Sequence, residues 1–242
     1  MIEQIKTGLE AHISARTDIT LQERDRMFSL LGDYFDGYRR SNFERDLDEK
    51  HEVLFLRNKN GDIQGFTTIL FLETKVDEEK VRGIFSGDTI VSKEYWNENT
   101  LAREWSRYML EVADRSKERL FWFLICSGFR TYRFLPTFFK EFFPRYERLT
   151  PNFEQQVLDT FAAIKFPGEY NPKTGLVTFG SSTERLKEGI GEITQERLSN
   201  PNINYFVTRN PNHAQGAELA CLTEISKRNY KPSALRRFGI EV

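Results

Sequence analysis

One segment of the chain has the order of elements that binding a phosphate group requires: a strand, a polar loop and an amphipathic helix. A strand-like run at residues 81–92 leads to the loop Asn-Glu-Asn-Thr-Leu-Ala at residues 97–102, where a helical pattern begins. The first backbone N–H groups of a helix lack intrahelical partners, and the helix dipole adds positive charge there. Because both effects favour an anion, residues 97–102 are predicted to hold a phosphate or pyrophosphate.

Aromatic residues are the second unusual feature of the chain. They make up 14% of it overall, but 11 of the 26 residues from Phe121 to Tyr146 are aromatic. Such a cluster is typical either of a bulky core or of an apolar channel or entry surface, and a channel is itself built from core residues. The sequence leaves both interpretations open.

Other chemistries lack their motifs in this sequence. There is no Gly-x-Ser-x-Gly nucleophile elbow, no Walker loop and no spacing of metal ligands, so no metal is expected. Cys126 and Cys221 stand in apolar, strand-like runs and are predicted to be reduced core thiols.

Charge and hydropathy exclude several classes of partner. The formal net charge is −1, which gives no global field that would attract nucleic acid or an anionic membrane. No window approaches 18 uncharged apolar residues, and the first residues lack the apolar stretch of a signal peptide. We therefore expect a cytoplasmic protein with no membrane span and no nucleic-acid partner.

The first half of the chain predicts a strand, two helices and a meander of three strands. Residues 21–48 have a helical period, with Thr20 as N-cap, Glu23 as its capping-box partner and Gly37 as the break between two helices. Strands are predicted at residues 10–16, 52–56, 63–74 and 81–92, and a tight turn at residues 58–62.

The predicted phosphate loop is followed by a helix with one apolar face and by a strand that we expect to be buried. The helix places Trp105, Met109 and their apolar neighbours on one face. Residues 120–126 are continuously apolar, which indicates a strand buried on both faces. After Pro136 we predict a further helix that carries four phenylalanines, Phe138, Phe139, Phe142 and Phe143.

Beyond residue 146 the patterns predict helices at residues 153–164 and 183–198 and strands at residues 204–208 and 218–225. Together the elements predict an α/β (α+β) fold with a mixed central β-sheet flanked by helices. We expect residues 1–150 to form the core and residues 151–242 to be a C-terminal extension that completes the sheet and the acceptor site, unless the two are one continuous domain.

Over residues 10–146 this order of elements is similar to that of the GNAT superfamily of acyl-CoA N-acyltransferases, and residues 127–136 resemble divergent bacterial GNAT-like proteins. In that family a Gln/Arg-x-x-Gly-x-Gly/Ala loop holds the pyrophosphate of coenzyme A. Here Ala102 fits that pattern, Asn97 and Thr100 depart from it, and Glu98 adds a negative charge. The resemblance implies a co-substrate site at residues that follow the fourth strand or belong to it: Ile90, Val91, Asn97, Asn99, Thr100, Leu101 and Ala102.

The resemblance also implies roles for three residues in transfer to an amine. Asp88 is the expected base or amine-orienting group, and its alternative role is that of a turn or bulge carboxylate. Tyr132, which follows the strand at 120–126, is the expected acid, and its alternative is a packed aromatic. His213 lies in a loop between the predicted closing strands, where it or Glu218 would assist proton transfer unless the histidine is simply exposed.

The function that the resemblance implies is an N-acyltransferase. We expect the acyl group to come from a coenzyme A thioester and to be of medium or long chain, because an acyl channel is predicted at Phe134, Phe138, Phe139 and Phe142 and each buried methylene contributes about 0.8 kcal/mol. The acceptor would be an amine of an amino acid, a polyamine or a Lys- or Orn-type peptide side chain.

Two alternatives remain because of the departures at residues 97–102. The donor would be an acyl carrier protein thioester, whose arm lacks the adenosine diphosphate end, or the fold would be a non-catalytic binding module. A homodimer formed by pairing of a C-terminal strand is also consistent with the pattern.

Overall fold

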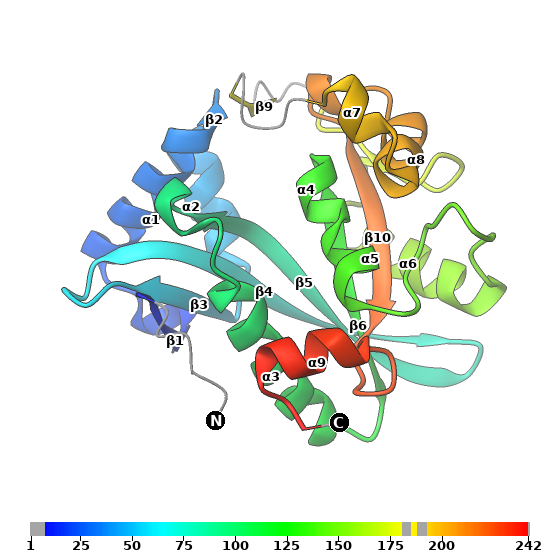
Figure 1. The fold of residues 1–242 in the computed structure, drawn as a ribbon, viewed down its shortest axis with the longest axis horizontal. Coiled ribbons are helices and arrows are strands. Elements are labelled where there is room, and N and C mark those ends of the chain that lie inside the picture. The colour runs from blue at the N-terminus through cyan, green and yellow to red at the C-terminus, as the bar shows by residue number, and fades with distance from the viewer. Residues whose placement is uncertain (1–7, 181–184, 188–192, 242) are drawn as a thin grey trace.

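The computed structural model describes residues 8–180, 185–187 and 193–241. Within these residues one sheet has eight strands, and β5 and β6 are its parallel pair, whereas the other neighbours are antiparallel (Figure 1). The strands from one edge to the other are β1 (Glu10–Ala15), β3 (Glu52–Arg57), β4 (Ile63–Val76), β5 (Glu79–Val91), β6 (Arg119–Cys126), β10 (Glu218–Glu224), β8 (Leu176–Val177) and β7 (Tyr170–Asn171).

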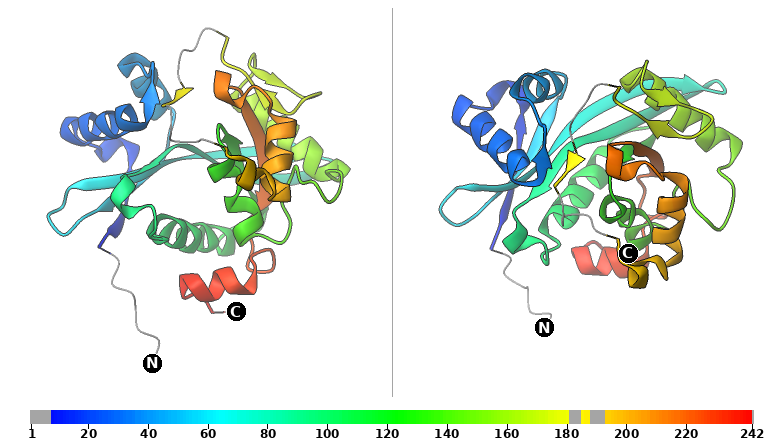
Figure 2. Two further views of the ribbon diagram at one scale, coloured as in Figure 1. Left: turned by 45° about the horizontal axis from the view of Figure 1, so that its top comes forward. Right: turned by 90° about the horizontal axis from the view of Figure 1, so that it is seen from above.

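Helices cover both faces of this sheet (Figure 2). One face carries α1 (Leu21–Tyr34), α2 (Arg40–Asp48) and α6 (Asn152–Lys165), which form two apolar clusters with the sheet. The other face carries a larger cluster under α3 (Thr100–Asp114), α4 (Phe129–Tyr132), α5 (Phe134–Phe138), α8 (Pro201–Arg209) and α9 (Pro232–Phe238).

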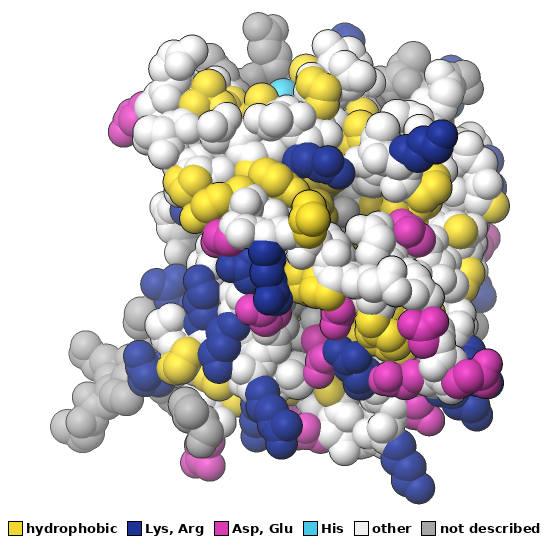
Figure 3. Space-filling model, turned by 90° about the vertical axis from the view of Figure 1, so that its right-hand side faces the viewer, with side chains coloured by type: hydrophobic (Ala, Val, Ile, Leu, Met, Phe, Trp, Pro, Cys, Tyr) yellow, Lys and Arg dark blue, Asp and Glu magenta, His cyan; other side chains and the backbone are white. Residues whose placement is uncertain are grey.

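The shorter elements join these layers. They are the 3-10 helices η1 (Arg16–Asp18), η2 (Lys93–Tyr95) and η3 (His213–Gln215), the helix α7 (Gln195–Leu198), and the strands β2 (Phe35–Asp36) and β9 (Arg185–Leu186), which pair with each other. The side of the molecule shown in Figure 3 carries basic, acidic and apolar side chains together. Among the described residues, no helix combines the length and the apolarity needed to cross a membrane.

The predicted fold class is confirmed: the molecule is a mixed α/β structure with helices on both faces of a large mixed sheet. Local signals account for much of it. Thr20 and Glu23 form the expected capping box of α1, and Gly37, between α1 and α2, has a φ of 72° that suits glycine. The turn before β4 uses Gly61 with a φ of 86°.

Three predicted elements are wrong. Residues 204–208 are not a strand but part of α8, because Asn200 caps that helix by accepting hydrogen bonds from the N–H groups of Asn202 and Ile203. The helix after Pro136 ends at Phe138. Beyond it the chain is extended, since Phe143 exchanges backbone hydrogen bonds with Leu222 of β10.

The helix predicted at residues 183–198 is the third error. Only Gln195–Leu198 is helical, and Arg185–Leu186 is a strand; residues 181–184 and 188–192 lie outside the described residues. In the same C-terminal part, β10, β8 and β7 continue the central sheet beyond β6. The division of the chain near residue 150 stays a prediction.

A close contact at Gly83 of β5 fixes the distance of α6 from the sheet. A Cβ atom added there would lie 2.7 Å from Cζ of Phe161, a fully buried ring of α6. We expect Gly83→Ala to lower the free energy of unfolding by about 1–3 kcal/mol, because overpacking displaces the ring. Urea unfolding measures this loss. Gly168→Ala is the matched control, since a Cβ there meets nothing within 4 Å, and an equal loss in both variants would contradict the packing argument.

Candidate active site

The two central strands separate halfway along their length. β5 and β6 pair from Val81 and Arg119 to Phe85 and Phe123, where their register ends. Beyond that point β5 runs on to Val91 and β6 to Cys126, and the two strands diverge (Figure 1). We call this region, residues 86–91 of β5 and 124–126 of β6, the fork. At the fork the facing strand edges present backbone groups to each other without a shared ladder.

A β-bulge lies where the fork opens. Thr67 of β4 pairs with Thr89 of β5, and Ile69 pairs with Ser86, so three steps along β5 match two along β4. The extra residue falls within Ser86, Gly87 and Asp88. Bulges bend a strand and redirect its side chains. Here the bulge turns Asp88 toward the connection between α1 and α2, where the Tyr38 hydroxyl donates to Oδ2 of Asp88 over 2.6 Å.

Ser86, on the other side of the bulge, is held from the opposite face of the sheet. Nε1 of Trp122 on β6 donates to Oγ of Ser86 over 3.0 Å. The Trp122 ring packs against Trp105 of α3, with ring centroids 4.3 Å apart. The bulge is therefore fixed by one hydrogen bond on each face of the sheet, at the point where the strands separate.

Lys50 packs against the bulge from the α2 face, and its side chain has no solvent-exposed surface. Its Nζ donates to the carbonyl and to Oδ2 of Asp46, at 2.9 and 2.5 Å, and lies 5.6 Å from the centre of the Phe85 ring. Burial lowers the pKa of the Lys50 ammonium, and the Asp46 carboxylate opposes that shift. A Cβ atom on Gly87 would lie 2.7 Å from Cε of Lys50, so a larger residue there would force this lysine side chain to shift.

Asp46 is shared by two lysines. Nζ of Lys165, at the end of α6, donates to Oδ1 of Asp46 over 3.1 Å and to Glu49 over 2.5 Å. Burial opposes ionisation of Asp46, but the two ammonium groups hold the pKa of its carboxyl below the usual value. Two lysines and two carboxylates thus form a compact ion network where α2 and α6 meet.

The predicted phosphate loop, residues 97–102, contains the start of a helix. α3 begins at Thr100, and the Asn99 side chain makes no capping hydrogen bond to the helix. Thr100 and Ala102 are buried, Leu101 is partly buried, and Asn97 is exposed. The Thr100 hydroxyl donates to Oε2 of Glu98 over 3.2 Å. A carboxylate therefore lies beside the helix N-terminus, where it would repel a phosphate.

Ile90 and Val91, the other predicted co-substrate residues, form the end of β5. Ile90 is buried against α1, and the Val91 carbonyl accepts a hydrogen bond of 2.7 Å from Nε1 of Trp96. Arg130 of α4 lies 5.2 Å above the Trp96 ring, so it connects the two sides of the fork near its open end. The co-substrate role of these residues stays a prediction.

Tyr132 and His213 make their described contacts with residues other than those of the bulge. The Tyr132 hydroxyl is buried and donates to the Pro144 carbonyl over 2.9 Å, and burial raises the pKa of this tyrosine. The His213 ring lies 5.7 Å from Phe206, and burial lowers the pKa of this histidine. No described contact joins either residue to Asp88, so their catalytic roles stay predictions that the hydrogen bonds do not favour.

The rings of the predicted acyl channel pack against other rings. Phe138 lies 5.0 Å from Phe238, Phe139 lies 4.5 Å from Tyr230, and Phe142 makes an edge contact with Tyr132. Phe134 is 36% exposed, whereas the other three phenylalanines are buried. The three buried rings belong to the apolar cluster on this face of the sheet, and a channel among the four phenylalanines stays a prediction.

Tyr38, Lys50 and Lys165 were not predicted. Each comes from a helix end or a helix connection. Tyr38 and Lys165 meet Asp88 and Asp46 through tertiary contacts. Lys50 instead lies four residues after Asp46, so its i, i+4 spacing was the signal that could have found it. The described residues contain no group of three His, Cys, Asp or Glu that would hold a metal.

Comparison with known proteins gives solved structures alone. No protein-family model matches the chain. No curated protein matches it either. The solved structures include a probable N-acyltransferase of Enterococcus faecalis V583 (14% identity, 52% of this chain and 31% of that one, TM-score 0.40). They also include a GNAT family N-acetyltransferase of Escherichia coli in complex with CoA (15%, 53% and 69%, TM-score 0.37).

A third match is glucosamine-6-phosphate N-acetyltransferase of Arabidopsis thaliana, at 12% identity over 53% of this chain and 89% of that one, with a TM-score of 0.39. These structures belong to the kind of protein that the sequence resembles, and each matches about half of this chain. The chain spans about a third of the Enterococcus faecalis protein. At these TM-scores the overlap is partial, so any activity has to be inferred from the site itself.

The hydrogen bond between Tyr38 and Asp88 predicts an energetic coupling. In a double-mutant cycle of Tyr38→Phe and Asp88→Ala, urea unfolding should give a coupling energy of about 1.5 kcal/mol, because the bond involves an ionised carboxylate. Additive effects of the two substitutions, within about 0.5 kcal/mol, would show that the contact does not form in solution.

Proposed function

We propose that the chain transfers an acyl group from a pantetheine thioester to an amine at the fork. The observation that carries the proposal is the bulge, which brings an anchored carboxylate, Asp88, next to the separated edges of β5 and β6. Acyl transfer needs a hydrogen-bond donor for the thioester oxygen and a base for the amine. Backbone N–H groups along the fork supply the first, and Asp88 supplies the second.

The reaction then balances without a metal ion. The amine nitrogen attacks the thioester carbon, a C–N bond forms and the C–S bond breaks. Asp88 accepts the proton that the nitrogen loses, and the departing thiolate is protonated by solvent or by an acid. Tyr132 is the acid that the sequence predicts, and in that role its hydroxyl would have to leave the Pro144 carbonyl.

Glu98 favours one form of the donor over another. Its carboxylate lies beside the N-terminus of α3, where the pyrophosphate of coenzyme A would otherwise bind. An acyl carrier protein presents a pantetheine arm without the adenosine diphosphate end. The single phosphate of that arm could pair with Arg130, which is exposed near the open end of the fork. A carrier-bound thioester is therefore the second candidate donor, beside acyl-CoA.

Acyl length is the remaining part of the proposal. The aromatic cluster after β6 supports a medium or long chain, because apolar rings would bind methylene groups in place of water. Phe138 packs against Phe238 of α9 and Phe139 packs against Tyr230, so an acyl chain would have to displace these rings. The acceptor is proposed to be an amino acid, a polyamine or a Lys- or Orn-type peptide side chain.

Donor binding can be tested before the acceptor is known. The melting temperature is measured with acetyl-, octanoyl- and palmitoyl-CoA and with free coenzyme A. A donor at 100 times its dissociation constant should add about 2.7 kcal/mol of stability. A shift that grows with acyl length supports a fatty donor, an equal shift for all donors contradicts that length, and no shift with any of them leaves the carrier-bound donor as the candidate to test.

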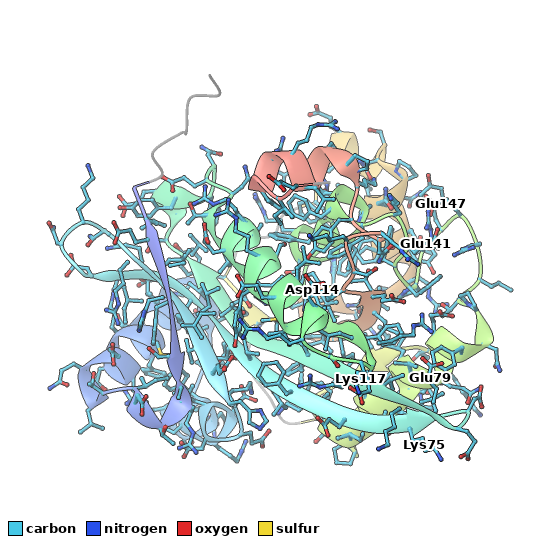
Figure 4. All side chains as sticks on the ribbon, turned by 90° about the horizontal axis from the view of Figure 1, so that it is seen from below. Lys75, Glu79, Asp114, Lys117, Glu141 and Glu147 are labelled. Atoms are coloured by element: carbon cyan, nitrogen blue, oxygen red, sulfur yellow. The ribbon has the colours of Figure 1, made fainter. Side chains whose placement is uncertain are left out.

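Removal of the proposed base tests catalysis. With an accepted donor and a panel of amines, released thiol is followed with a thiol reagent, to which the fully buried Cys126 and Cys221 do not respond. We expect Asp88→Asn to lower kcat/KM at least about 100-fold, as loss of a general base does. Asp114→Asn, an exposed carboxylate at the end of α3 (Figure 4), is the control. Similar activity in wild type and Asp88→Asn would remove Asp88 from the mechanism.

A further inference from the structure

Lys50 raises an energetic question that the fold alone does not answer. Its ammonium group is completely buried, and taking such a charge out of water costs several kcal/mol unless partners offset it. The described hydrogen bonds of Nζ go to Asp46 alone. A hydrophobic residue of similar length would fill the same space without this cost.

Asp46 does not by itself require Lys50. Its other carboxylate oxygen is bound by Lys165, which also binds Glu49 and whose side chain is 9% exposed. Without Lys50, Asp46 would still have an ammonium partner. The second buried charge therefore calls for another reason, and the surroundings of Nζ indicate one.

On its other side Lys50 faces the bulge. The position of a Cβ on Gly87 lies 2.7 Å from Cε and 3.3 Å from Nζ of Lys50, and 2.5 Å from Oγ1 of Thr68. This threonine hydroxyl is buried and has no hydrogen-bond partner among the described residues. The lysine thus supports the glycine of the bulge directly, one residue before Asp88.

The charges around this contact come from three elements. Asp46 of α2, Lys165 of α6 and Asp88 of β5 act on Lys50, and the carboxylate of Asp88 favours its charged form. Tyr38, before α2, donates to Asp88 from another direction. Since Coulomb attraction is mutual, Lys50 equally favours the ionised form of Asp88.

We propose that Lys50 is a positioning residue for transfer: it seats the bulge and keeps Asp88 ionised, ready to accept the proton of the amine. This role rests on the proposed function, because it assigns Lys50 to the base of that reaction. It also explains why the chain buries the Lys50 ammonium, although Lys165 already neutralises Asp46.

The test compares two variants, Lys50→Met and Lys165→Met. The second is the control, because it removes the other cation that pairs with Asp46 but leaves Lys50 beside the bulge. The acid limb of the kcat/KM profile should move up by about one pH unit or more in Lys50→Met, as expected on loss of a neighbouring opposite charge. It should stay in place in Lys165→Met. If both variants move the limb equally, or neither does, the proposal is wrong.

A second measurement needs no turnover. The 13C signal of the Asp88 carboxyl group is titrated by NMR in wild type and in both variants, with Lys50→Gln as a substitute if Lys50→Met does not fold. A higher titration midpoint in the Lys50 variant alone supports the proposal, and an unchanged midpoint overturns it. If the midpoint shifts in the Lys50 variant but the wild-type protein transfers no acyl group, the proposed function is refuted and the charge interaction between Lys50 and Asp88 still stands.

Discussion

The end of the parallel pairing between β5 and β6 is the constraint on which the candidate site depends. Pairing stops at Phe85 and Phe123, and the next residues of β5 contain the bulge. An extra residue bends a strand and increases its local twist, so β5 cannot continue beside β6. The same extra residue turns Asp88 toward Tyr38. One local irregularity therefore both opens the fork and places a carboxylate beside it.

The ion network lies between two apolar clusters on one face of the sheet. The cluster under α1 and α2 includes Phe66 and Ile90, and the cluster under α6 includes Phe85 and Leu72. Thr68 lies between Phe66 and Leu70 along β4, so the polar residues fill the interval between the clusters. A continuous apolar layer would avoid the desolvation cost of these charges. The break in that layer coincides with the bulge.

Local signals made part of this arrangement predictable. The capping box at Thr20, the glycine turn at Gly61 and the apolar face of α3 depend on neighbouring residues, and each was found from the sequence. Asp88 was also singled out, as the expected base or amine-orienting group with a turn or bulge carboxylate as its alternative role. The partners of Asp88 and Asp46 were not found. Tyr38 and Lys165 come from distant parts of the chain, so no local pattern announces them. Lys50 lies only four residues after Asp46, and that i, i+4 spacing is a local signal that could have predicted the pair.

The same distinction explains the errors. The run of phenylalanines after Pro136 has a helical spacing, but backbone bonds to β10 hold Phe143 in an extended chain. The strand-like run at residues 204–208 does not include Asn200, whose side chain caps the start of α8. In the first case a tertiary contact overrides local preference, and in the second the capping signal lies upstream of the strand-like run.

The strands on the outer sides of the fork keep it open. β4 pairs with β5 as far as Val91, and β10 pairs with β6 as far as Cys126, so each diverging end is held by its outer neighbour. Closing the fork would require one of these ladders to break, which would leave buried backbone groups unpaired. Since β10 comes from residues 218–224, the C-terminal part of the chain takes part in the geometry of the site formed by β5 and β6. The geometry of the fork therefore depends on the whole sheet, and not on the segment from β5 to β6 alone.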